Sequence, residues 1–167
     1  MTARKVLSFD WILWFQWIMA TAWGWILGSL LFAGIYLAAA GVTVAVFQWV
    51  ILRSHLRGAW RWLPASIIGW GVGTGLAFAL GQLEPSFVTG SLLGSAVGLA
   101  QWLILRREVR WAGWWIAISV VGWSTGMSMA LAPLLAGVLA GAMTGIALLL
   151  LPRMPKAAQP NQARESL

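Results

Sequence analysis

Gln48 and Gln101 are the polar residues whose positions suggest chemistry, because each stands five residues before an arginine at the end of an apolar run. In a helix, five residues place the amide ~7–8 Å inside the helix end. An amide at that depth is unfavourable against lipid and is suited to a hydrogen bond between helices. Its oxygen can also ligate a hard cation such as the magnesium of a chlorin. Helix packing is the favoured interpretation, and a contact to a chlorin or quinone is the alternative.

Three tryptophans, Trp25, Trp70 and Trp123, lie in GWxxG segments deep inside apolar runs. Trp70 and Trp123 follow Trp62 and Trp115 by eight residues, which is ~12 Å along a helix. Indoles at this depth indicate core packing, with flat walls for a chlorin, carotenoid or quinone as the alternative. The tryptophans near basic residues predict an aromatic belt at the membrane interface: Trp11, Trp14, Trp49, Trp60, Trp62, Trp102, Trp111, Trp114 and Trp115.

Ionisable side chains are missing from the middle of every apolar run. Proton relays, ion sites and substrate clamps in membranes need such groups, so we expect neither an enzyme nor an ion-coupled transporter. His55, the single histidine, lies in a basic loop, where a solvated side chain is favoured over a (bacterio)chlorophyll ligand. The chain has no cysteine, and we expect no metal site.

The composition is that of a polytopic α-helical membrane protein. Hydrophobic residues make up 60% and charged residues 9% of the 167 residues, whereas about a quarter of residues are charged in soluble domains. A bilayer span takes roughly 20 apolar residues. Six spans are predicted near residues 10–30, 33–53, 63–82, 86–106, 112–131 and 133–152.

The distribution of charge predicts the orientation. With six spans, all 11 Lys and Arg residues fall on one side, which the positive-inside rule makes cytoplasmic. We therefore expect a bacterial cytoplasmic membrane protein with a cytoplasmic N-terminus at 1–9 and a disordered cytoplasmic tail at 154–167. The net charge of +7 comes from basic residues at the ends of apolar runs. It therefore does not indicate binding to nucleic acid. The start resembles a signal peptide weakly, but its apolar run continues past Ala22, so cleavage is not expected.

An internal repeat accounts for much of the sequence. Shifting the chain by 53 residues places QWVILRSHLRGAWRW (48–62) on QWLILRREVRWAGWW (101–115). A weaker third copy aligns Trp17, Thr21 and Trp25 with Trp62, Ser66 and Trp70. The repeat predicts three parallel helical hairpins, near 10–53, 62–106 and 111–153, in a pseudo-threefold or arc-like arrangement.

Glycines spaced by four along the second helix of each hairpin predict close helix packing. In the third hairpin the Gln-Trp pair of the repeat is replaced by Leu148-Leu149. A groove for a lipid or pigment is the alternative for these faces. The glycines are Gly41 in the first hairpin, Gly90, Gly94 and Gly98 in the second, and Gly137, Gly141 and Gly145 in the third.

With its repeated QWLxLR…GWW…S…GW pattern, the chain resembles a group of small polytopic membrane proteins of phototrophic and related bacteria. The resemblance implies the hairpin fold and no particular activity. We expect a non-enzymatic structural or accessory subunit that packs in the bilayer against other membrane proteins or itself, for example in a photosynthetic or respiratory assembly. The alternatives are a passive channel or small-solute permease, and a protein that binds a pigment or quinone.

Overall fold

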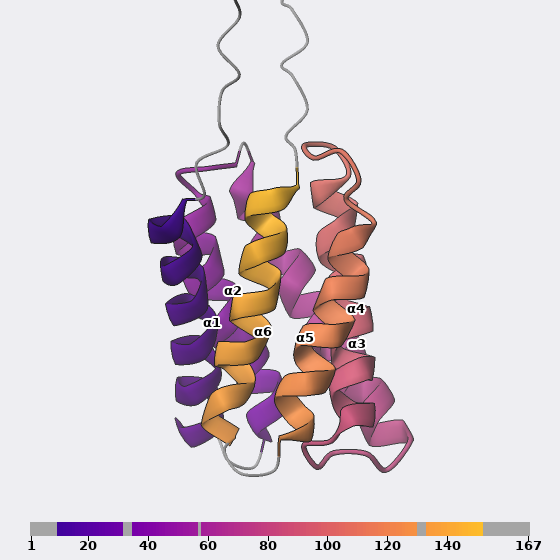
Figure 1. Cartoon of the computed structure of the whole chain (residues 1–167). Helices are drawn as coiled ribbons and strands as arrows, with labels where there is room; N and C mark the ends of the chain where they lie inside the picture. Colours follow the sequence, from indigo (N-terminus) through magenta and orange to yellow (C-terminus); the bar gives the residue numbers. More distant parts are fainter. Residues whose placement is uncertain (1–9, 32–34, 57, 130–132, 152–167) are drawn as a thin grey trace, which may run out of the picture.

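The described part of the protein is a bundle of six α-helices without strands (Figure 1). A computed structural model describes residues 10–31, 35–56, 58–129 and 133–151. The predicted tail at 154–167, the segment 1–9 and residue 57 lie outside these ranges. The helices agree with the predicted spans to within a few residues: α1 Trp11–Leu31, α2 Tyr36–Leu52, α3 Trp62–Ala79, α4 Phe87–Leu105, α5 Trp114–Ser128 and α6 Pro133–Leu150.

Local sequence explains where several helices begin and end. The Asp10 carboxylate accepts a hydrogen bond from the Leu13 backbone N–H at 3.0 Å and caps α1, and the Ser86 hydroxyl accepts from the Thr89 N–H at 3.1 Å and caps α4. Such caps satisfy N–H groups that have no partner within the helix. α3 gives way to a turn in which Gly81 takes a φ of 64°, a conformation that glycine adopts without steric cost.

The six helices form a closed ring. Each helix packs against its neighbours in the chain, and α1 also packs against α6. Figure 1 shows α6 beside α1 on one side and α5 on the other. The arrangement is therefore a ring of three hairpins and not an open arc.

Positive charge gathers at one end of the ring, which we call the basic end. The connections from α2 to α3 and from α4 to α5 lie there, together with the start of α1 and the end of α6 (Figure 1). The α3–α4 connection, with Glu84, lies at the opposite end. The basic side chains in the described ranges all belong to the basic end: Arg53, Arg61, Arg106, Arg107 and Arg110.

Two sets of glycines bring the helices together. The GWxxG glycines act within hairpins: a Cβ on Gly69 would lie 2.8 Å from the Val97 Cα in α4. The second-helix glycines act between hairpins, since a Cβ on Gly94 would lie 2.6 Å from the Ser119 carbonyl oxygen in α5. Close approach of this kind needs a residue without a side chain. Gly90 and Gly98 contact α5 in the same way, Gly137, Gly141 and Gly145 contact α1, and Gly41 contacts the ring of Trp70.

The α2–α3 interface is the loosest in the ring. Leu37 and Ala45 of α2 stand where the 53-residue shift places Gly90 and Gly98 of α4, so α2 cannot approach its neighbour as closely. A cavity of about 370 Å³ opens between α2 and α3, with Ala38, Thr74 and Gly75 in its lining. The asymmetry of the ring therefore follows from two substituted glycine positions.

Two helices in the described ranges are long and apolar enough to cross a membrane, namely Ala59–Ala79 and Phe87–Leu105. Tyr36–Leu52 and Leu135–Leu150 are shorter apolar helices. α1 is a 21-residue helix without an acidic or basic residue.

Candidate functional site

The centre of the ring near the basic end is filled by three indoles, one from each hairpin. Trp17, Trp62 and Trp115 are 0–1% exposed. Their rings meet edge to face, with centroids 5.9 Å apart for Trp17 and Trp62, 6.2 Å for Trp17 and Trp115, and 5.7 Å for Trp62 and Trp115. This is a favoured geometry for aromatic pairs. We call these three residues the first indole triad.

A second indole triad, Trp25, Trp70 and Trp123, fills the centre deeper in the bundle. Trp70 and Trp123 meet edge to face with centroids 4.9 Å apart, and Trp25 lies 6.2 Å from Trp70 and 5.6 Å from Trp123. All three are buried, and they pack with Leu93 and Val97. The middle of the ring is thus occupied by side chains at two levels.

Gln48 joins its own hairpin to the next one. Its Nε2 donates to the Thr21 hydroxyl at 3.0 Å, and its Oε1 accepts from the Trp62 indole N–H at 3.2 Å. Thr21 in turn donates to the Trp17 carbonyl oxygen at 2.9 Å. The amide therefore holds one indole of the first triad in place and lies 5% exposed.

Gln101 makes the same two bonds one hairpin later. Its Nε2 donates to the Ser66 hydroxyl at 2.9 Å, and its Oε1 accepts from the Trp115 indole N–H at 2.9 Å. The residue is 4% exposed. Gln48 and Gln101 are related by the 53-residue shift, as are Trp62 and Trp115, and each glutamine accepts the indole N–H of its tryptophan.

The third hairpin provides a different hydrogen-bond acceptor for an indole of the first triad. Leu148 replaces the glutamine, and the Trp17 indole N–H donates to the Thr144 hydroxyl at 3.0 Å, one helical turn earlier on α6. Ser119, at the position of Thr21 and Ser66, has a buried hydroxyl without a hydrogen-bond partner in the described ranges. Each indole of the first triad keeps an acceptor, but only two of the acceptors are amides.

These hydrogen bonds and ring contacts concern the residues for which the sequence left packing and pigment binding as alternatives. Gln48 and Gln101 use both ends of their amides inside the protein, as the packing interpretation requires. Trp25, Trp70 and Trp123 pack against one another and not around an open slot. His55 lies outside this centre, where its Nδ1 is 3.0 Å from the Ile51 carbonyl oxygen and 2.9 Å from the Ser54 hydroxyl.

The aromatic belt was assigned wrongly at two positions. Trp62 and Trp115 lie near basic residues in the sequence, but they are buried and bonded to glutamines. Trp11, Trp60, Trp111 and Trp114 are exposed, as expected for a belt. Proximity to arginine in the sequence does not reveal which side of the helix faces the centre.

Two members of the centre were missed as site residues. Trp17 stands at the repeat position of Trp62 and Trp115, so the alignment of the three copies contained the signal. Thr144 has no counterpart in the other hairpins, and its role follows only from its distance to Trp17.

Comparison of the chain with protein-family models, curated proteins and solved structures found no match. The resemblance to small bacterial membrane proteins therefore stays a prediction. Among the described residues, no group of three or more metal-ligating side chains of the His, Cys, Asp and Glu types occurs.

Proposed function

We propose that the protein is a six-span membrane protein whose helices all cross the bilayer. The distribution of exposed side chains supports this. Polar residues such as Gln48, Ser66 and Gln101 are buried inside the bundle, while large apolar side chains are exposed on every helix. A soluble monomer rarely exposes apolar patches larger than a few hundred Å². The outward apolar residues include Phe15 on α1, Val46 on α2, Ile68 on α3, Leu99 on α4, Val121 on α5 and Ile146 on α6.

Within that membrane, we propose a non-enzymatic structural or accessory role. The observation that carries this proposal is the filled centre, in which two indole triads occupy the axis and the amides of Gln48 and Gln101 are hydrogen-bonded within the bundle. A protein built in this way offers its outer surface, and not an internal site, to partners. Other membrane proteins, or further copies of this chain, are the partners that such an apolar surface fits.

The same observation weighs against the two alternatives. A passive channel along the axis needs a continuous opening, and the triads lie across it at two levels. A pigment or quinone bound through Gln48, Gln101, Trp70 or Trp123 needs side chains whose hydrogen bonds and faces are open. In this bundle those amides bind Thr21, Ser66 and two indoles.

Mild detergent extraction followed by native electrophoresis tests the accessory role. The expected result is comigration with a larger membrane assembly or as a defined oligomer. A single small particle under every extraction condition contradicts the proposal. The isolated chain from the same sample is expected to show no absorption band in the visible range.

Liposome flux separates this proposal from a channel. Vesicles that contain the purified protein are expected to take up a small neutral solute such as glycerol no faster than empty vesicles. Flux that is saturable, and that changes in the Trp70→Phe variant, would contradict the closed axis. Trp60→Phe is the matched control, because Trp60 is exposed at the basic end.

A further inference from the structure

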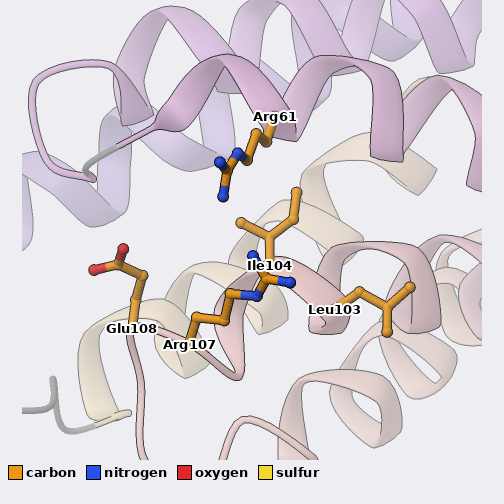
Figure 2. A pocket seen from close by; sticks show the side chains of 5 residues that line it. All are labelled: Arg61, Leu103, Ile104, Arg107 and Glu108. Carbon is orange, nitrogen blue, oxygen red and sulfur yellow. The ribbon is translucent and has the colours of Figure 1, made fainter.

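A small groove opens at the basic end between the start of α3 and the end of α4. Its volume is about 200 Å³, and Arg61, Leu103, Ile104, Arg107 and Glu108 line it. Figure 2 shows Arg61 extending from its helix toward the end of α4, where Ile104 and Arg107 lie. Two arginines and one glutamate thus line the groove together with two apolar residues.

The net charge of the side chains that line this groove is positive, since two arginines stand against one glutamate. In the described ranges, neither Arg61 nor Arg107 forms an ion pair with Glu108 or another carboxylate. The Arg61 guanidinium lies 5.7 Å from the centre of the Trp60 ring, which leaves its hydrogen-bond donors available.

The first hairpin contains the same groove without the charge. Gln16, Val50, Ile51 and Ser54 line a cavity of about 510 Å³ between α1 and α2. The repeat aligns these four residues with Arg61, Leu103, Ile104 and Arg107. The hairpin therefore folds around this groove with neutral residues at both arginine positions, and packing does not require the two positive charges.

We propose that the Arg61–Arg107 groove binds the phosphate of an anionic phospholipid, with the acyl chains lying over Leu103 and Ile104. Guanidinium groups bind phosphate oxygens through paired, charge-assisted hydrogen bonds. Basic pockets between membrane helices on the cytoplasmic side bind lipid headgroups in this way. Leu103 lines the groove and is half exposed, so it offers an apolar surface to an acyl chain. The inference rests on the proposed membrane location.

Glu108 refines the choice of headgroup. A carboxylate beside the phosphate repels a second anionic group and accepts hydrogen bonds from hydroxyls. A phosphatidylglycerol headgroup supplies one phosphate charge and two hydroxyl donors. Two arginines and one glutamate leave a single net positive charge, which one phosphodiester neutralises.

Native mass spectrometry of the purified full-length chain with added phosphatidylglycerol tests the proposal. Wild type is expected to retain one phosphatidylglycerol and to discriminate against phosphatidylcholine. The R61Q/R107S variant installs the residues of the first hairpin. Loss of even one charge-assisted hydrogen bond is expected to weaken retention about tenfold.

The matched control is R53Q/R110S, which removes the same charge from exposed arginines at the same end. It is expected to retain the lipid as wild type does. Equal loss in both double variants would show diffuse attraction to surface charge and overturn the site. The converse variant, Q16R/S54R, is expected to raise the stoichiometry from one lipid to two, and an unchanged stoichiometry opposes the proposal even if R61Q/R107S fails to fold.

Two further measurements identify the ligand. Inorganic phosphate at millimolar concentration is expected not to displace the lipid, and displacement would assign the groove to a soluble anion. The anionic preference would be overturned if the protein retained phosphatidylethanolamine better than phosphatidylglycerol and if E108Q abolished that difference. Because these measurements use the isolated chain, they are independent of whether it copurifies with an assembly. Its absence from the membrane fraction would instead contradict the proposed function.

Discussion

Leu148 stands where the first two hairpins have a glutamine, and the hydroxyl of Ser119 has no hydrogen-bond partner in the described part of the protein. In the other two hairpins a glutamine at the position of Leu148 donates to the hydroxyl that corresponds to Ser119. A buried polar group without a partner costs about 1–3 kcal/mol. The third hairpin therefore contains a defect that the first two lack.

The L148Q substitution is expected to repair this defect. The new amide would reach the Ser119 hydroxyl and stabilise the protein by about 1 kcal/mol, as a typical buried hydrogen bond does. Thermal unfolding in detergent, followed by circular dichroism, measures the change. The exposed Leu150 provides the control L150Q, and a midpoint for L148Q at or below that of L150Q would contradict the prediction.

The reverse substitution, Q101L, is expected to destabilise the second hairpin. It leaves the Trp115 indole N–H and the Ser66 hydroxyl without the bonds that Gln101 supplies. The expected cost is about 1–3 kcal/mol per buried group. A double-mutant cycle with Trp115→Phe measures the coupling, which should exceed about 0.5 kcal/mol if the bond is made. Q16L, at an exposed glutamine, is expected to change the unfolding midpoint little.

Glycines in and out of the helix interfaces are expected to respond oppositely to alanine. In G94A the new Cβ would lie 2.6 Å from the Ser119 carbonyl oxygen, and overpacking of this kind typically costs about 1–3 kcal/mol. Gly71 has open space around its Cα, so G71A should be neutral or stabilise α3 by about 0.5–1 kcal/mol. Comparison of the two unfolding midpoints is the test, and equal effects would contradict the glycine-mediated contact.

The absence of native cysteine makes the proposed orientation accessible to thiol labelling. S54C lies in the connection at the basic end and E84C in the connection at the opposite end. A membrane-impermeant maleimide is expected to label E84C in intact cells and S54C only after permeabilisation. Labelling of both residues from outside would contradict the six-span topology, and the cysteine-free parent is the blank.

The helices and the glycine contacts were predictable because they depend on patterns along single segments. Apolar runs placed six helices, and the spacing of Gly90, Gly94 and Gly98 placed one face of α4 against another helix. The meeting of Trp17, Trp62 and Trp115 at the axis was not predicted, because it depends on the angular position of each side chain relative to two other hairpins. Trp62 and Trp60 are two residues apart, yet one lies at the axis and the other at the surface. Closure of the ring likewise depends on α6 meeting α1, which no local pattern encodes.

The contact between α6 and α1, which closes the ring, determines the order in which the bundle assembles. α6 bears the glycines that fit against α1, and Thr144 is the acceptor for the Trp17 indole. The residues that meet there come from opposite ends of the sequence, so α1 reaches its last neighbour only after the final helix has been synthesised. Until then one flank of the first hairpin lacks its packing partner, and the Trp17 indole N–H lacks its acceptor. Ring closure is consequently the late, long-range step of folding, and a chain that ends after α5 cannot complete it.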